Sequence, residues 1–379
     1  MKKLLVLSIF CTVISLKAAA PVDAPVLQRN ESLRHELNRS AERAKKWLLA
    51  QQQTNGAWST PDHPAVTGLA MAAISRFKEA EDAAALDRGL GYLKSCVQTN
   101  GAIFKKSELI NYNTSVSLLG FLAHKPTEHR EIIQRANNFL VGSQISPDNK
   151  AGAVFVGGVG YGSKYSHSDM GNTLHALEAI HYAQTFLRRE GASDFDQLNV
   201  AAAIEFLQNC QNLPSHNKQA WVSGDPQNIG GFIYYPGHSM AGSTNLSSGR
   251  TALRSYGSVS YAGLLSYIYT DLKAEDPRVK AVIEWLEKNY TLEENPGMEQ
   301  QGLYYYFHTM AKALTAAGME TIQTPAGSVK WREQLLSRLM NLQQADGSWV
   351  NTNARWWEKD PVLVTSYMLI ALSQISEGI

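Results

Sequence analysis

The chain has 379 residues, of which 44% are hydrophobic and 18% are charged, so it holds enough apolar material for a sizeable core. Lysine and arginine number 35 against 34 aspartate and glutamate residues, which gives a net charge of +1. This balance, with no basic stripe along the chain, argues against nucleic acid or another polyanion as a partner.

The first twenty residues carry the pattern of a secretory signal peptide. Lys2 and Lys3 precede an apolar run at 4–16, and alanines follow at 18–20. The run is shorter than the roughly 20 residues that span a bilayer, and no second long apolar stretch follows. We therefore predict a signal peptide (1–20), a linker (21–32) and one domain (33–379) in an exported protein, periplasmic or extracellular. A retained N-terminal anchor is the alternative, and contact with a membrane surface stays open.

Cys11 lies inside the predicted signal peptide, which leaves Cys96 and Cys210 in the mature chain. An oxidising compartment permits one disulfide between them, and two separate buried thiols fit equally well. Neither cysteine has a CxxC partner or a histidine at metal spacing. We therefore expect no structural zinc site and no cofactor.

From residue 47 onward, the chain repeats a plan of a helix, a Gln/Gly/aromatic turn and a second helix. The first turn reads QQQTNGAW at 51–58, and the last reads QQADGSW at 343–349. Weaker copies follow the same order at 98–104, 144–162, 211–235 and 285–304. These about six units, spaced roughly 45 to 80 residues apart, indicate a helical repeat architecture.

The segments after the turns show helical periodicity. Apolar residues at 66, 69, 70, 73 and 74 fall at i, i+3, i+4, i+7 and i+8, and 364–372 repeats this spacing. No stretch shows sustained β alternation, so the predicted fold class is all-α. In each turn, glycine allows the left-handed backbone that ends a helix, the aromatic residue covers the core, and the glutamine amide is expected to bond terminal carbonyls.

The Gln-Gln-x-x-Gly-x-Trp turn followed by a helix hairpin resembles the repeats of squalene and oxidosqualene cyclases and of protein prenyltransferase β subunits. The resemblance covers residues 33–372 and implies an (α/α)6 toroid of about six helical hairpins. Within it, 157–179 and 256–314 resemble uncharacterised exported bacterial proteins built of the same repeats.

The resemblance also identifies the candidate acid. Squalene-hopene-type cyclases begin their reaction with a DxDDT motif, whose central aspartate donates a proton. The similar stretch here, 169–173, reads DMGNT, so Asp169 and Thr173 agree while Gly171 replaces the central acid. Asp169 itself is the remaining candidate acid, and its structural interpretation is a helix N-cap.

The zinc signature of protein prenyltransferases is also missing. That site needs an Asp-x-Cys pair and a later histidine, whereas 254–261 holds neither an acid nor a cysteine. His308 stands about where the family's zinc histidine would be, without its partners. His175, Glu178 and His181 are spread around a helix, so we predict no metal ion there.

In toroids of this kind, the N-terminal ends of the inner helices meet at one mouth of the ring. A pocket with aromatic walls and a few polar groups suits an apolar ligand, and aromatic faces stabilise carbocations. The alternative is that these aromatic residues fill a barrel that binds nothing. The predicted catalytic residues are Asp169 and His308, and the predicted ligand-binding residues are His167, Tyr256, Tyr304, Tyr305, Trp356 and Trp357.

Together these features lead us to expect a protein that binds or processes an apolar, isoprenoid-like molecule, as a divergent cyclase or isomerase if it is an enzyme. A second hypothesis is a non-catalytic toroid in the cell envelope that binds a protein partner. A third is a carbohydrate-active enzyme. Glycosidases need two opposed carboxylates, which Asp62, Asp169 and Asp360 could supply in number.

Overall fold

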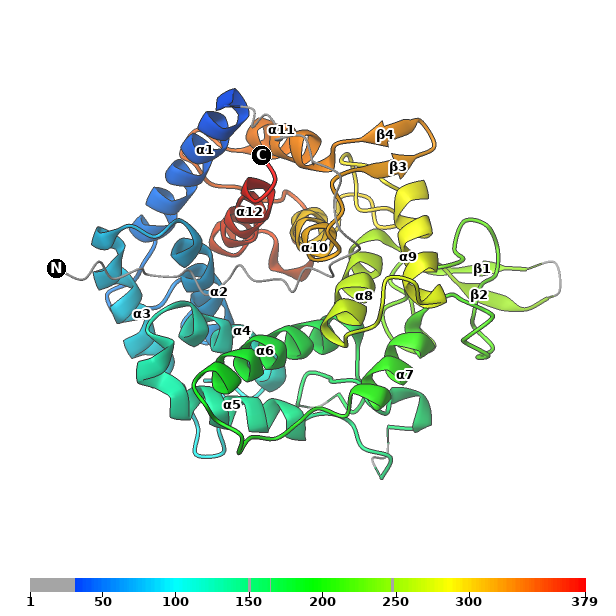
Figure 1. Ribbon diagram of the computed structural model, residues 1–379, viewed down its shortest axis with the longest axis horizontal. Helices are drawn as coiled ribbons and strands as arrows, with labels where there is room; N and C mark the ends of the chain where they lie inside the picture. The colour runs from blue at the N-terminus through cyan, green and yellow to red at the C-terminus, as the bar shows by residue number, and fades with distance from the viewer. Residues whose placement is uncertain (1–30, 149–150, 164, 247–248) are drawn as a thin grey trace, which may run out of the picture.

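The computed structural model describes residues 31–148, 151–163, 165–246 and 249–379, and within them the helices form two concentric rings (Figure 1). The inner ring comprises α2 (Pro64–Ile74), α4 (Ile110–Ala123), α6 (Met170–Arg189), α8 (Gly257–Tyr269), α10 (Leu303–Ala316) and α12 (Pro361–Ser376). The outer ring comprises α1 (Glu31–Ala50), α3 (Ala83–Lys94), α5 (Arg130–Gly142), α7 (Val200–Cys210), α9 (Pro277–Lys288) and α11 (Trp331–Leu342). The predicted signal peptide with Cys11, and most of the predicted linker, lie outside the described residues.

Each inner helix packs against the next one, and α12 packs against α2, so the ring is closed. This arrangement confirms the predicted all-α toroid. Two short hairpins were not expected: β1 (Ser243–Asn245) with β2 (Thr251–Leu253), and β3 (Ile322–Thr324) with β4 (Gly327–Val329). Strands of three residues are too short to give an alternating pattern. The first helix also begins at Glu31, slightly before the predicted domain start at Leu33.

The tryptophan of each strong repeat turn caps the outer helix before it. The indole Nε1 of Trp58 donates to the carbonyl of Leu48 at 2.7 Å, and that of Trp349 donates to Leu339 at 2.8 Å. These carbonyls lie in the last turn of α1 and α11, where no intrahelical donor remains. The indoles therefore satisfy the terminal carbonyls that the sequence analysis assigned to glutamine.

The glutamine instead ties neighbouring outer helices together. Gln52 Nε2 donates to the carbonyl of Gly56 in its own turn at 3.1 Å and to Ala85 in α3 at 2.8 Å. Gln343 Nε2 reaches Ser40 in α1 at 3.0 Å, which joins the last turn of the chain to the first helix. The repeated turn therefore closes the outer ring as well as each hairpin.

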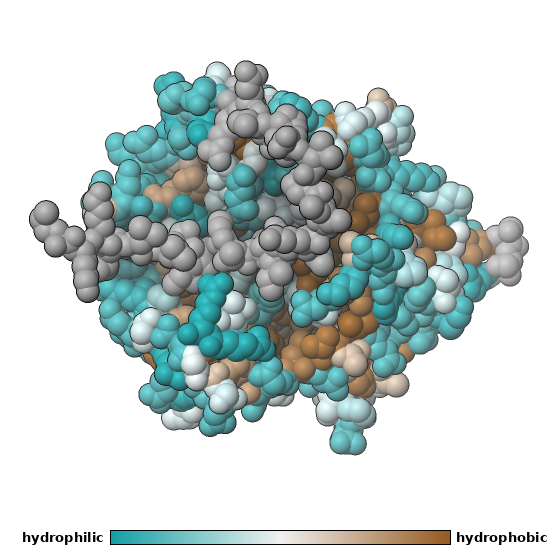
Figure 2. Space-filling model, in the orientation of Figure 1, coloured by the Kyte–Doolittle hydropathy of each residue, from teal (hydrophilic) through white to brown (hydrophobic). Residues whose placement is uncertain are grey.

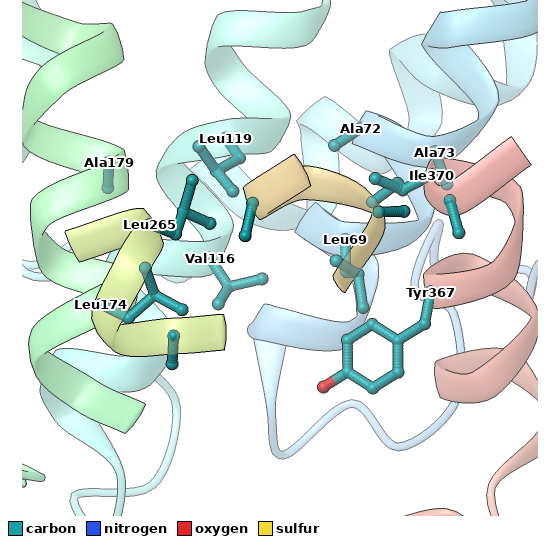
Figure 3. Close-up of a cluster of buried hydrophobic side chains, with 14 of the residues drawn as sticks. Leu69, Ala72, Ala73, Val116, Leu119, Leu174, Ala179, Leu265, Tyr367 and Ile370 are labelled. Carbon is teal, nitrogen blue, oxygen red and sulfur yellow. The ribbon is translucent and has the colours of Figure 1, made fainter. Parts of the chain in front are cut away.

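Small residues allow α2 and α4 to approach closely. A Cβ atom added to Gly68 would lie 2.6 Å from the Cα of Ser117, and one added to Gly120 would lie 3.0 Å from the Cα of Gly68. A glycine pair thus forms the contact between these two inner helices. Leu69 of α2, Val116 of α4 and Tyr367 of α12 are buried and point toward the interior of the ring (Figure 3).

We expect Gly68→Ala to lower the free energy of unfolding by about 1–3 kcal/mol, because its methyl group would press on the backbone of α4. The matched control is Gly91→Ala on α3, where an added Cβ meets nothing within 4 Å. That change is expected to raise stability by about 0.5–1 kcal/mol, since alanine favours a helix over glycine. Urea unfolding of both variants measures the two effects, and equal changes would contradict the packing argument.

Cys96 and Cys210 are both buried and unpaired, so of the two alternatives the structure shows separate thiols. Burial raises the pKa of each thiol, which keeps both unreactive. Within the described residues, none of the helices combines the length and the apolar character that crossing a bilayer requires. The face seen along the ring axis is mainly hydrophilic at its rim, with hydrophobic residues showing chiefly inside it (Figure 2).

Candidate functional site

A cavity of about 280 Å³ lies at the N-terminal ends of the inner helices, inside the ring. Aromatic and aliphatic side chains make up most of its wall, and a few polar groups interrupt them. This volume is close to the lower end of the usual range for small-molecule sites. Its lining residues include His63, Val66, Leu109, Tyr112, Tyr161, Asp169, Gly171, Asn172, His175, Tyr234, Tyr256, Ser258, Tyr305, Trp356, Trp357, Leu363 and Tyr367.

Asp169 is the N-cap of α6, and its carboxyl group is fully buried on the cavity wall. Its Oδ1 accepts the backbone N–H of Asn172 at 2.9 Å, and its Oδ2 accepts the amide Nδ2 of the same residue at 2.7 Å. Burial raises the pKa of Asp169 to about 6, although these two donors oppose the shift. Below about pH 6, most Asp169 side chains therefore carry a proton that they can donate.

The phenol rings around Asp169 stay neutral. The hydroxyl groups of Tyr161 and Tyr234 lie 2.8 Å apart and share a hydrogen bond. Burial raises the pKa of Tyr161, Tyr256 and Tyr305 above the ordinary range. The buried hydroxyl of Tyr305 has no hydrogen-bond partner among the described residues. The wall thus offers π faces and one unpaired hydroxyl without any competing negative charge from tyrosine.

Two tryptophans lie where the cavity meets solvent. Trp356 and Trp357 are 38% and 46% exposed, and both have positive φ angles, 53° and 67°. Two consecutive bulky residues in this conformation are rare and cost free energy, so the surrounding contacts must hold them. The ring of His63 lies edge-on to Trp357 at 4.7 Å, and the Arg355 guanidinium lies 4.6 Å above Trp356.

Glu358 fixes this tryptophan pair to the ring. Its buried carboxyl accepts the backbone N–H of Tyr305 at 2.7 Å, at the start of α10, and the amide of Asn351 at 2.6 Å. Burial raises its pKa to about 7, although these donors favour the charged form. Glu358 therefore caps α10 from a distant segment and holds the Trp356–Trp357 turn at the mouth.

A second cavity of about 20 Å³ lies beneath the first one, and its wall carries Arg76, Glu178, His308 and Lys312. The Lys312 ammonium pairs with the Glu178 carboxylate, and both side chains are almost fully buried. Burial lowers the pKa of His308 well below its usual value, and Lys312 adds to this effect. The two cavities share three wall residues, Tyr112, His175 and Tyr367.

Of the predicted site residues, the structure brings Asp169, Tyr256, Tyr305, Trp356 and Trp357 together around the main cavity. The other three predicted site residues lie outside the lining of the main cavity. His308 faces the smaller cavity, His167 stacks on Tyr235 at 4.3 Å outside the lining, and Tyr304 is buried edge-on against Phe307 at 6.1 Å.

The predicted carboxylates do not gather at the cavity. Asp62 is half-buried and pairs with Lys106 at 2.7 Å, and Asp360 is the N-cap of α12, accepting the backbone N–H of Val362 at 2.9 Å. Among the described lining residues, Asp169 is the only carboxylate.

Sequence reasoning missed much of the wall, namely Tyr112, Tyr161, His175, Tyr234 and Tyr367. Tyr161 and Tyr234 belong to repeat turns whose aromatic residues were assigned a structural role. Tyr367 lies on the apolar face of α12, where a core residue and a cavity residue share the same spacing. The signal that could have revealed them is the excess of tyrosine over phenylalanine, 16 against 11, because a phenol is needed only where its hydroxyl has a use.

No family model matches the chain, and no curated protein matches it in sequence. Solved structures of the same fold do exist. A variant of the type II terpene cyclase MstE from Scytonema, in complex with the substrate geranylgeranyl dihydroxybenzoate, superposes with a TM-score of 0.56 at 12% identity, over 92% of this chain and 99% of that one. The GH76A α-1,6-mannanase from Salegentibacter gives 0.52 at 12% identity, over 90% and 100%. A family 76 glycoside hydrolase from a bovine Bacteroides thetaiotaomicron strain gives 0.52 at 9%, over 89% and 77%. This chain therefore has the α/α-toroid fold of terpene cyclases, a fold that these glycoside hydrolases share.

Proposed function

We propose that the protein binds a short, apolar, isoprenoid-like molecule in its central cavity and cyclises or isomerises it with Asp169 as the general acid. The observation that carries this proposal is a buried carboxyl group of raised pKa on an otherwise aromatic cavity wall. Such a group holds its proton up to about pH 6 and can transfer it to a bound alkene or epoxide. The structures of the terpene cyclase MstE, whose substrate carries a geranylgeranyl group, support the choice of ligand class.

The wall suits the charge that follows protonation. Donation of the Asp169 proton leaves a carboxylate on α6 and a carbocation in the ligand. The faces of Tyr256, Tyr305 and Trp356 can stabilise the cation through their π electrons, since none of these rings ionises. The backbone and amide donors of Asn172 stabilise the carboxylate that remains.

A glycoside hydrolase is the second candidate, because enzymes of this class share the fold. Both mechanisms of glycoside hydrolysis use two carboxylates that flank the bond, roughly 5–9.5 Å apart. The described lining of this cavity supplies Asp169 alone as a carboxylate, and aromatic and aliphatic groups make up most of the remaining wall. The geometry therefore favours the isoprenoid reaction over the carbohydrate one.

The test is native mass spectrometry of the protein purified from its own host, followed by organic extraction. We expect a bound terpenoid or prenylated lipid that is lost in Ala262→Phe, whose ring would occupy the cavity. Thermal unfolding of this variant checks that it is folded. A ligand-free mass in repeated preparations, together with no binding of farnesyl acetate, would instead favour the protein-binding toroid. An oligosaccharide in the extract would favour the hydrolase.

A further inference from the structure

His175 lies where α6 forms the boundary between the two cavities. It follows Gly171 and Asn172 at i+4 and i+3, so all three face the main cavity from one side of the helix. The rings of Tyr112 and Tyr305 flank it at 5.2 and 6.2 Å. His175 also lines the cavity, and the ring nitrogen that carries no proton has a lone pair for a ligand.

His175 is neutral when the ligand binds. Burial lowers its pKa to about 4, and the Lys312 ammonium adds to this effect, while Glu178 opposes it. A neutral imidazole has one nitrogen that donates and one that accepts a proton. In the aromatic cavity, the accepting nitrogen of this neutral ring can act as a base.

An ion pair lies behind His175, and its carboxylate is the member that favours a protonated ring. Glu178 lies one turn further along α6, in the wall of the smaller cavity, and its carboxylate favours the protonated form of the His175 ring. Lys312 of α10 neutralises this carboxylate in the resting state, and Arg76 also lines the smaller cavity. Asp169 and His175 are six residues apart, roughly 9 Å along the helix axis, so one short ligand can contact both.

We propose that His175 is the base that ends the reaction, a role that rests on the proposed function. Asp169 breaks its O–H bond and forms a C–H bond at an alkene carbon of the ligand, which becomes a cation. At the end, a C–H bond next to the cationic carbon breaks, its electron pair forms a C=C bond, and the proton binds to the free nitrogen of His175. The imidazolium and the Asp169 carboxylate then exchange the proton with solvent, so the ligand is isomerised with no net gain or loss of atoms.

The experiment follows the products that the full chain forms from farnesyl acetate in D2O, by gas chromatography and mass spectrometry. Wild type is expected to give cyclic alkenes with one deuterium, which Asp169 delivers to carbon. In His175→Gln, alkene formation is expected to fall about 10²-fold, and the cation is captured by water to give the corresponding alcohol. Consumption of the ester continues, because protonation by Asp169 does not need His175.

His175→Phe is the second variant, since it keeps an aromatic ring between Tyr112 and Tyr305 but removes the lone pair. It should give the same shift from alkene to alcohol even if the glutamine variant is unstable. The matched control is His181→Gln on the exposed side of the same helix, which should keep the wild-type products. An unchanged alkene-to-alcohol ratio in both His175 variants, or a shift in His308→Gln alone, overturns the assignment. Consumption by wild type no faster than by Asp169→Asn overturns the proposed function itself.

Discussion

Replacing Asp169 with asparagine is expected to slow the consumption of farnesyl acetate by about 10³-fold, because the amide has no proton to donate. The fold should survive the change. Asparagine is as good an N-cap as aspartate, and the unpaired Oδ1 of Asn172 can accept from the new amide if the Asn172 side chain flips. The measurement is product formation at fixed enzyme concentration, with far-ultraviolet circular dichroism to confirm the helices.

The same variant has a distinctive dependence on pH. The pKa of Asp169 is raised to about 6 in the folded protein, above the ordinary value of 3.8, so its contribution to stability is present below pH 3.8 and is lost as pH rises through 6. Asp169→Asn does not suffer this loss. Between pH 4 and pH 8 the variant should therefore gain about 2–2.5 kcal/mol in unfolding free energy relative to wild type. Glu358, whose pKa is also raised, affects both proteins equally and cancels in the difference.

Asp360→Asn is the control for the turnover measurement. Asp360 caps α12 as Asp169 caps α6, but it lies outside the cavity lining. This variant should keep turnover. If Asp169→Asn loses only stability and keeps turnover, the residue is a helix cap and nothing more. If turnover in the wild type does not decline as pH rises through 6, Asp169 does not act as the acid.

The fold could be predicted from the sequence because the repeat uses unusual residues for local reasons. Gly56 has a φ of 87°, and a Cβ there would lie 2.3 Å from the carbonyl of Arg88, so the turn and the packing of the next outer helix both require glycine. Trp58 is needed for the carbonyl of Leu48. Such constraints recur in each unit and are visible in one chain. The hairpin of β1 and β2 occurs once and carries no such pattern.

The site could be predicted only in part, because its residues are selected by their distance from the ring axis. Asp169 and Tyr256 could be found, since they lie at helix starts that the repeat identifies. His308 and His175 both lie on inner helices. Their depth in the ring decides which cavity they line: His308 lines the small cavity, whereas His175 lines both cavities. Glu358 caps α10 from a segment more than 50 residues away, a contact that no local pattern predicts.

Replacing Lys312 with methionine is expected to lower the unfolding free energy by about 3–5 kcal/mol. Burial alone would raise the pKa of Glu178, and the Lys312 ammonium outweighs it, so the carboxylate stays charged inside the ring. Removing the lysine leaves that charge without its hydrogen-bonded partner. The charge of Arg76 still favours the Glu178 carboxylate, so we expect a loss of unfolding free energy near the lower end of this range.

The double variant Lys312→Met with Glu178→Leu should recover most of the lost stability, because two apolar side chains of similar size replace both charges. Lys330→Met is the control: Lys330 pairs with Glu333 at 2.8 Å on the exposed start of α11, where solvent weakens the pair, so stability should hardly change. Guanidinium unfolding of the four proteins gives the interaction energy directly. A double variant as unstable as Lys312→Met would mean that packing, not charge, determines the loss. If it is instead restored in stability but forms more alcohol from farnesyl acetate, the ion pair serves the chemistry at His175 rather than the fold.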